Sequence, residues 1–181
     1  MAGERTLLSY TPEIKVVDCT IRDGGLTNDF FFTDQFVKDL YIANLKAGVD
    51  YMEFGYKASK DMFDVKKFGK WKFSDDEDIR AIVGDNNTNM KISVMADVGR
   101  CDYEKDIIDK KDSPIDMIRV ATYINTIPAA VAMIEYCHEK GYATPTILKQ
   151  SVPPLPTLQI LPVASCSNTQ SVEYPLTILP K

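Results

Sequence analysis

The sequence predicts an α/β fold in which four strand-helix units follow one another along the chain. Short β-branched and apolar runs alternate with segments in which apolar residues recur at helical spacing. Most of the helical segments also have recognisable start and stop residues. Strands separated by helices need crossover connections, which give parallel strands within one sheet. Four such units suit either half of an eight-stranded (β/α) barrel or an open doubly wound sheet.

The first unit combines a predicted strand over 14–21 with a predicted helix over 33–47. The strand run is Ile-Lys-Val-Val-Asp-Cys-Thr-Ile, and Arg-Asp-Gly-Gly follows at once, which is typical of a buried strand that enters a turn. Thr33 is placed to cap the start of the helix, and Gly48 is placed to end it.

The second unit begins with a predicted strand over 51–56. A long excursion over 57–73 follows, in the place where barrel enzymes have loops that face the substrate. The run Ser-Asp-Asp-Glu from Ser74 to Glu77 predicts a capping box that opens a helix, and Gly84 is placed to end it.

The third and fourth units follow the same pattern. The third has alternating residues over 92–98, which predict a strand, and a weaker helix over 103–110. The fourth has a predicted strand over 116–124 and a helix with Pro128 in its first turn and Gly141 beyond its end.

Composition and charge favour a globular protein and argue against two kinds of partner. Of the 181 residues, 45% are hydrophobic and 26% are charged, which is enough apolar surface for a core. The formal net charge of -5 argues against a nucleic-acid partner, because phosphate contacts need clustered Lys and Arg. No apolar run is long enough for a membrane span, and residues 1–12 lack the apolar core of a signal peptide. We therefore expect a cytoplasmic protein with no membrane partner.

The composition changes abruptly after Thr144. Residues 145–181 contain seven of the ten prolines and no glycine, and proline disrupts both strands and helices, so we expect no fifth strand-helix unit there. The segment is nevertheless more apolar than a solvated linker. It is either a tail translated from a shifted or alternative reading frame or a genuine proline-rich extension. The predicted organisation is an arm over 1–12, an α/β domain over 13–144 and an irregular tail over 145–181.

Arg22 and Asp23 stand side by side where the first predicted strand ends. A carboxylate in this place can hold a hard divalent cation, and a guanidinium beside it can stabilise the negative oxygen that develops on an enolate. The alternative is an ion pair that caps the strand, with the following glycines making the turn. The residues by themselves leave both interpretations open.

Two runs of residues resemble the first two strands of a known family. They are Asp-Cys-Thr-Ile-Arg-Asp-Gly, from Asp18 to Gly24, and Ala-Gly-Val-Asp-Tyr-Met-Glu-Phe-Gly, from Ala47 to Gly55. The family comprises the metal-dependent (DRE-TIM) lyases, aldolases and synthases related to 3-hydroxy-3-methylglutaryl-CoA lyase, isopropylmalate synthase, homocitrate synthase and 4-hydroxy-2-oxovalerate aldolase. Its signature is Asp-x-Thr-x-Arg-Asp-Gly. The resemblance covers the four predicted units, and Gly25 favours the aldolase-like branch.

The resemblance implies that the chain carries the N-terminal half, four βα units, of a TIM (β/α)8 barrel. It also implies an aldolase or lyase that depends on a divalent metal and acts on a small 2-oxo acid. The carbon-carbon bond next to the carbonyl is cleaved or formed through an enolate. By this resemblance Asp23 is a metal ligand, Arg22 polarises the carbonyl or enolate oxygen, and Glu53 is a catalytic residue at the mouth of the second strand.

The chain departs from the family at the metal site. The family completes that site with a His-x-His pair, whereas this chain has one histidine, His138, late in the fourth predicted helix. A histidine there is more typical of a partner for the helix dipole. Because Asp23 is then the one matched ligand, we expect Mg2+ or Mn2+ to bind weakly.

Three further polar residues follow predicted strands and are candidates for substrate contacts, namely Asp97, Tyr123 and Asn125. Each also has an ordinary structural explanation: Asp97 can cap the turn at Gly99, and Tyr123 can be a strand aromatic.

Two other functions stay open. The chain could be a catalytically inactive, truncated remnant that acts through association, or a synthase of the isopropylmalate synthase type that uses an acyl-CoA. A half barrel exposes the outer edges of its first and fourth predicted strands, which predicts self-association through those edges. An open-sheet nucleotide binder has no support from motifs, since the sequence contains neither G-x-G-x-x-G nor a P-loop lysine.

Overall fold

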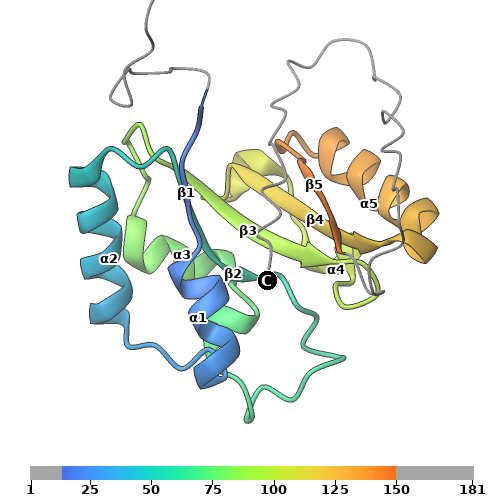
Figure 1. Cartoon of the computed structure of the whole chain (residues 1–181), viewed down its shortest axis with the longest axis horizontal. Coiled ribbons are helices and arrows are strands. Elements are labelled where there is room, and N and C mark those ends of the chain that lie inside the picture. The colour runs from blue at the N-terminus through green and yellow to red at the C-terminus, as the bar shows by residue number, and fades with distance from the viewer. Residues whose placement is uncertain (1–13, 150–181) are drawn as a thin grey trace, which may run out of the picture. The chain divides into compact units, whose positions relative to one another are not determined.

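The structure is a computed structural model that describes residues 14–149 of the chain (Figure 1). These residues form a sheet of parallel strands in the order β1-β2-β3-β4-β5, curled into half of a barrel with helices along it. The predicted fold class, half of an α/β barrel, is confirmed. An open doubly wound sheet would instead reverse its strand order at a switch point. The strands are β1 (Val17–Asp18), β2 (Tyr51–Tyr56), β3 (Lys91–Asp97), β4 (Met117–Tyr123) and β5 (Thr146–Lys149).

Strands β2 and β3 form the centre of the core because both of their faces are covered. Every residue over 52–56 and over 92–97 is buried, as expected for the middle of a parallel sheet. The register places Glu53 beside Ser93, so these two side chains share a face of the sheet. Met95 lies beside Arg119 of β4 on that same face. We call it the Glu53 face.

The first strand is shorter than the predicted strand over 14–21. The strand ends at Asp18, and helix α1 (Thr20–Asn28) begins where the sequence suggests the end of a strand and then a turn. Gly25 lies inside this helix, where a Cβ would be only 2.2 Å from the ring of Phe30. This glycine therefore allows Phe30 to pack closely on the helix. The helix ends at Asp29, whose φ of 52° lies in the left-handed region.

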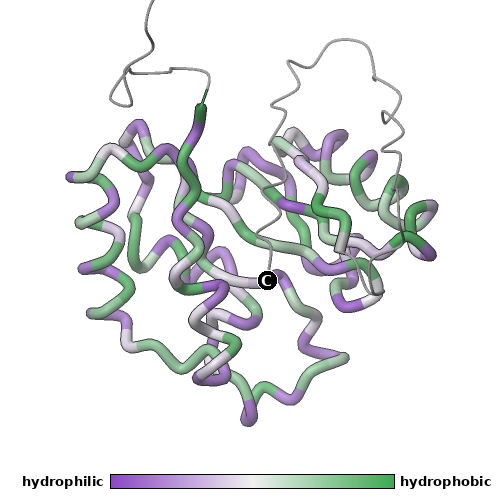
Figure 2. Tube along the Cα trace, viewed as in Figure 1, coloured by the Kyte–Doolittle hydropathy of each residue, from purple (hydrophilic) through white to green (hydrophobic). Residues whose placement is uncertain are grey.

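Helix α2 (Asp34–Ala47) confirms its predicted start and stop residues. The hydroxyl of Thr33 accepts a hydrogen bond from the backbone N–H of Phe36 at 3.2 Å. Gly48 ends the helix with a φ of 71°, which glycine adopts without strain. Helix α5 (Ile127–Glu139) also has Pro128 in its first turn as predicted. Hydrophilic and hydrophobic residues alternate along both helices (Figure 2), because one side of each faces the sheet.

Helix α3 (Asp76–Val83) does not begin with the predicted capping box, because Ser74 lies one residue before the capping position. The hydroxyl of Ser74 donates a hydrogen bond to the Trp71 carbonyl at 3.0 Å, and Ser74 has a φ of 44°, so it cannot cap the helix. Asp75 takes the capping position without a side-chain hydrogen bond, whereas Gly84 ends the helix as predicted. The weak helix predicted over 103–110 is a short helix α4 (Tyr103–Asp106).

The excursion between β2 and α3 packs into the core. Trp71 is fully buried in a 3-10 turn, and Phe73 follows it in the same core. The ammonium group of Lys72 lies 4.6 Å from the ring centroid of Tyr56 and 4.7 Å from that of Phe63, at cation-π distance. The contact with Tyr56 holds the excursion against β2, and a 2.8 Å hydrogen bond from the N–H of Gly69 to the carbonyl of Asp29 joins it to the end of α1.

A short strand that the sequence analysis did not predict follows Thr144, and residues 145–149 contain no helix. Residues Thr146–Lys149 form β5, which runs parallel to β4 and pairs Val120 with Thr146. The prolines that forbid a regular strand begin only at Pro153, beyond the described residues. The outer edge of the sheet therefore belongs to β5 rather than to β4. The predicted arm over 1–12 and residues 150–181 of the predicted tail lie outside the described residues.

Within residues 14–149, the helices are too short or too polar to cross a membrane.

Replacing Gly55 by alanine should destabilise the fold. A Cβ at this position would lie 1.9 Å from the carbonyl oxygen of Trp71, which is backbone and cannot move aside alone. We expect a loss of about 3 kcal/mol in the free energy of unfolding. Urea unfolding followed by circular dichroism measures it, with Ile42→Ala on the exposed side of α2 as the control. Equal stability of the two variants would contradict the observed packing of the excursion.

We propose that the chain self-associates through its sheet edges. Within the described residues β1 and β5 are each paired on one side only, and both edges carry exposed apolar side chains, Val16 at 54% and Leu148 at 44% exposure. Such edges pair with another chain unless they are covered or charged. Leu148→Lys should therefore shift the chain toward monomer in analytical ultracentrifugation. Val131→Lys on α5, with 45% exposure, should leave association unchanged. A wild-type chain that stays monomeric at all concentrations would rule out this association.

Candidate functional site

A buried carboxylate with two arginines forms the candidate site. Glu53 lies within β2 with no exposed surface. Its Oε2 atom accepts a hydrogen bond from Nε of Arg22 at 2.8 Å and another from Nη1 of Arg119 at 2.9 Å. Its Oε1 atom has a longer contact of 3.5 Å with the hydroxyl of Ser93. Residues from α1, β2, β3 and β4 thus meet on the Glu53 face.

Helix α1 explains why Arg22 and Asp23 point in different directions. The first turn is closed by a 2.8 Å hydrogen bond from the N–H of Asp23 to the carbonyl of Cys19. Successive residues of a helix are rotated by about 100°. Arg22 therefore reaches inward, with its side chain 15% exposed, while Asp23 stays at the surface with 58% exposure.

The two side chains still meet at their ends. Nη1 of Arg22 lies 2.6 Å from Oδ1 of Asp23, and Nη2 lies 3.2 Å from Oδ2. Arg22 therefore binds a buried carboxylate through Nε and an exposed carboxylate through its two terminal nitrogens. The ion pair considered from the sequence is therefore present, although the glycines that follow it lie inside helix α1 rather than in a turn.

Arg22 stays protonated at any pH at which the protein folds. Burial lowers the pKa of Arg22, but the negative charge of Glu53 and hydrogen bonds to Tyr56 and Glu53 raise it by more, so the pKa lies above its ordinary value. A permanent cation in a partly buried place is suited to stabilise negative charge on a bound oxygen.

Arg119 is the member of the cluster that the sequence analysis missed. It lies within β4, in the apolar run Met-Ile-Arg-Val-Ala, and its side chain is 18% exposed. A charged residue inside an otherwise apolar strand of a parallel sheet was the available signal, because such a residue needs a buried partner. The identity of that partner, Glu53, depends on the register of strands 66 residues apart in the sequence.

Cys19 borders the cluster as a neutral thiol. Burial raises the pKa of the Cys19 thiol, and the charge of Glu53 raises it further, while Arg22 and Arg119 lower it by less. Nη1 of Arg119 lies 3.5 Å from its sulfur. A protonated thiol of this kind is a poor nucleophile, so the cluster offers donors and carboxylates rather than a thiolate.

The candidate substrate residues lie near the carboxyl ends of the strands. Asp97 ends β3 and is buried, and Tyr123 ends β4 with 38% exposure. Asn125 follows in an exposed 3-10 turn, and within residues 14–149 it forms no hydrogen bond with the arginines or Glu53. The structure thus brings Asp23 and Glu53 into contact with Arg22, and Asn125 does not contact these residues within the described part of the chain.

The described residues offer few possible ligands for a metal ion. Asp23 offers an exposed carboxylate, which is the right chemistry for Mg2+ or Mn2+. The oxygen Oδ2 of Asp18 is buried and has no hydrogen-bond partner in the described part of the chain. Between Ile14 and Lys149 there is no cluster of three or more His, Cys, Asp or Glu side chains that could hold an ion. These carboxylate oxygens are the kind of ligand that Mg2+ and Mn2+ prefer, but the described residues offer too few of them to hold the ion tightly.

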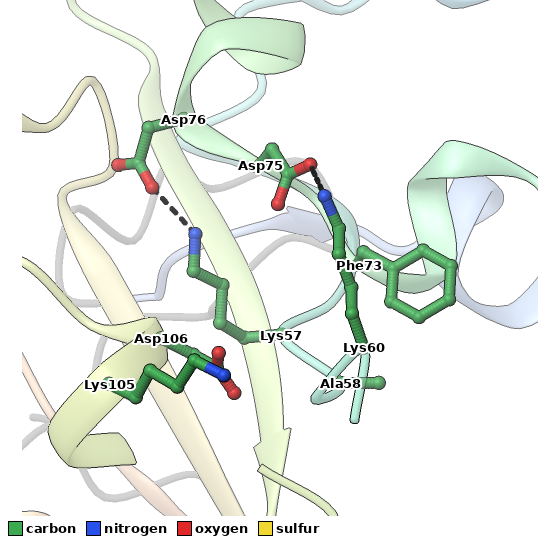
Figure 3. A pocket seen from close by; sticks show the side chains of 8 residues that line it. All are labelled: Lys57, Ala58, Lys60, Phe73, Asp75, Asp76, Lys105 and Asp106. Atoms are coloured by element: carbon green, nitrogen blue, oxygen red, sulfur yellow. Dashed lines mark hydrogen bonds and ion pairs between the residues drawn. The ribbon is translucent and has the colours of Figure 1, made fainter. Parts of the chain in front are cut away.

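A hollow of about 210 Å³ lies beside α3 and α4 (Figure 3). Its lysines are already bound to carboxylates. Nζ of Lys57 lies 2.6 Å from Asp76 and 3.1 Å from the carbonyl of Ser74, and Lys60 pairs with Asp75. These lysines connect the end of β2 to the start of α3. We regard the hollow as structural.

Comparison with known proteins supports the fold. No protein-family model matches the chain, and no curated protein matches it. Among solved structures, a crystal structure of the N-terminal domain of a candidate aldolase from Bacteroides vulgatus matches with a TM-score of 0.59 and 24% sequence identity. The match covers 75% of this chain and 44% of that chain, so the chain spans less than half the length of the structure it resembles. The described residues have an aldolase-like fold, in the form of half an α/β barrel.

Proposed function

We propose that the chain carries the enolate-stabilising half of a metal-dependent aldolase or lyase of the DRE-TIM family, acting on a small 2-oxo acid. The observation that supports this proposal most directly is the geometry of Arg22. Its Nε donates a hydrogen bond to buried Glu53, and its terminal nitrogens point to exposed Asp23. The aldolase-like fold and the signature over 18–24 support the same proposal. Fold alone does not define an activity, so the site carries the argument.

The proposed role of Arg22 is to stabilise negative charge on oxygen. In such a reaction the electron pair of the breaking carbon-carbon or carbon-hydrogen bond moves to the carbonyl oxygen of the 2-oxo acid, which becomes an enolate. A guanidinium that is already oriented can donate two hydrogen bonds to this oxygen without reorganising. Its terminal nitrogens become available when Asp23 turns away from Arg22.

The proposed role of Glu53 is to hold the arginines in place. A carboxylate with no exposed surface that accepts from two guanidinium groups is fixed by both. Glu53 is therefore a positioning residue in this proposal rather than an acid or base. Removing one partner of such a buried pair typically destabilises a protein by about 3–5 kcal/mol.

A divalent cation would bind at Asp23, the exposed carboxylate. When bound, it would polarise the substrate carbonyl as a Lewis acid. The remaining donors come from outside the described residues or from the substrate itself. For this reason the predicted affinity of the chain for the metal is low.

The first test of the proposed function is enolisation of pyruvate. In deuterium oxide with Mn2+, a base of the solvent or buffer takes a methyl proton of pyruvate, and the C–H electron pair forms the carbon-carbon double bond of the enolate. The site stabilises the enolate oxygen, and a deuteron from the solvent then adds to the methyl carbon. We expect exchange above that of free Mn2+, measured by NMR of the pyruvate methyl group. Arg22→Lys should lower the exchange rate by about a hundredfold, because a point-charge ammonium does not replace the planar two-donor fork. Arg100→Lys, at an exposed position, is the control.

Wild-type exchange no faster than that of free Mn2+ would count against an enolate-stabilising site. Exchange that persists unchanged in a folded Arg22→Lys variant would show that Arg22 has a structural role only. Circular dichroism confirms that each variant folds.

The second test concerns the metal. We expect Mn2+ to bind with a dissociation constant of about 1 mM or weaker, since one matched carboxylate holds a hard cation poorly. Asp23→Asn should abolish the binding, and Asp85→Asn, also an exposed carboxylate, should not. Electron paramagnetic resonance of free Mn2+ measures both. Tight stoichiometric binding, or binding that survives in Asp23→Asn, would show that other residues hold the metal.

A further inference from the structure

Within residues 14–149, the guanidinium nitrogens of the cluster that have no hydrogen-bond partner lie on Arg119 rather than on Arg22. Arg22 donates through Nε to Glu53 and through both terminal nitrogens to Asp23. Arg119 directs only Nη1 to its two partners, Glu53 and Cys19. Among residues 14–149, Nε and Nη2 of Arg119 have no hydrogen-bond partner. The two arginines therefore differ in what they can offer a ligand.

These two nitrogens form one edge of the guanidinium group, and that edge can bind a carboxylate. Nε and Nη2 point the same way along one side of a guanidinium and can hold a carboxylate through two parallel hydrogen bonds. The side chain of Arg119 is 18% exposed, and neither nitrogen is among the fully buried polar atoms that lack a partner. The free edge is thus open to a ligand, while Glu53 holds the opposite terminal nitrogen and fixes the orientation of the group.

Glu53 itself cannot accept hydrogen bonds from Nε and Nη2 of Arg119. Its Oε2 already accepts from both arginines, and its backbone is held in the middle of the sheet between β1 and β3. Asp23 is also engaged, because both of its oxygens contact Arg22. The lysines of the hollow in Figure 3 differ in this respect, since Lys57, Lys60 and Lys105 each have a carboxylate partner.

The charges of the cluster favour an anionic ligand. Arg22 and Arg119 are balanced by Glu53 and Asp23, so the four groups together are neutral. A divalent cation on Asp23 would leave an excess of positive charge in a partly buried place. Such an excess is unfavourable unless an anion enters with the cation.

We propose that Arg119 is a carboxylate-binding residue, which holds the carboxylate of a small 2-oxo acid through Nε and Nη2 beside Arg22. The identification of the anion as a 2-oxo acid rests on the proposed function; the carboxylate itself rests on the geometry of Arg119. The site takes small monocarboxylates with a neighbouring oxygen, such as pyruvate, and excludes their neutral amides.

The test is a titration of the full chain with pyruvate, followed by ligand-observed NMR, with pyruvamide as the uncharged probe. We expect pyruvate to bind and pyruvamide not to bind. Arg119→Lys keeps a cation next to Glu53 but loses the two-donor edge, so it should weaken pyruvate binding about tenfold or more. Arg100→Lys is the matched control and should bind as the wild type does. Unchanged affinity in a folded Arg119→Lys variant would overturn the proposal.

A second measurement uses the wild-type chain, so it does not depend on the folding of a variant. Phenylglyoxal modifies accessible guanidinium groups, and mass spectrometry locates the modified residue. Pyruvate should protect Arg119 severalfold and leave Arg100 unprotected, and pyruvamide should protect neither. Equal modification of Arg119 with and without pyruvate would overturn the proposal.

Titrations with Mn2+ and with a chelator separate this inference from the proposed function. Binding in the chelator that depends on Arg119 but gains nothing from Mn2+ supports the carboxylate site and counts against the metal-dependent reaction. Binding that requires Mn2+ and Asp23 but is unaffected by Arg119→Lys supports the metal and overturns the role of Arg119. No binding of pyruvate under either condition overturns the role of Arg119.

Discussion

The ion cluster around Glu53 is the constraint on which the candidate site depends. A carboxylate without any exposed surface is strongly destabilising unless cations and hydrogen-bond donors surround it. Arg22 and Arg119 satisfy this requirement, one from α1 and the other from β4. The cluster thereby connects helix α1 to β4, which lies two strands away from β2 in the sheet. It also fixes the orientation of the two groups that would act on a substrate.

The same cluster explains the unexpected course of the chain after β1. Ile21 is fully buried and Arg22 reaches Glu53, and both contacts require the backbone to turn inward directly after Asp18. A helix provides this turn within few residues, and a longer strand would carry Arg22 past Glu53. The glycine at position 25 is then needed for the close approach of Phe30 rather than for a turn.

The half-barrel form has consequences at its edges. A closed barrel has no free strand edge, whereas this sheet ends at β1 on one side and at β5 on the other within the described residues. The buried residues of β2 and β3 show that the middle of the sheet is nonetheless well packed. The centre of the sheet is therefore covered on both faces, although its two edge strands each lack a partner strand on one side within the described residues.

Local interactions made part of the fold predictable from the sequence. Thr33, Gly48, Pro128 and Gly84 mark helix ends correctly, because capping and left-handed backbone conformations depend on residues within one turn. The bounds of β2 were also predicted correctly from its apolar run. The capping box failed because the hydroxyl of Ser74 is bound to Trp71, a contact set by the packed excursion. Strand β5 was missed because the composition of the whole segment concealed four residues that pair with β4.

For the candidate site, the sequence pointed to three charged side chains, and the tertiary structure decided which groups they contact. Arg22 and Asp23 stood out as opposite charges at the end of an apolar strand, and Glu53 stood out through the resemblance to a known family. The sequence could not pair Glu53 with Arg119, because that contact depends on the register of three strands. Nor could it show that all three guanidinium nitrogens of Arg22 contact carboxylates, while Nε and Nη2 of Arg119 have no partner in residues 14–149. A contact between residues far apart in the chain is fixed only when the sheet forms, since no local interaction sets the distance between its strands.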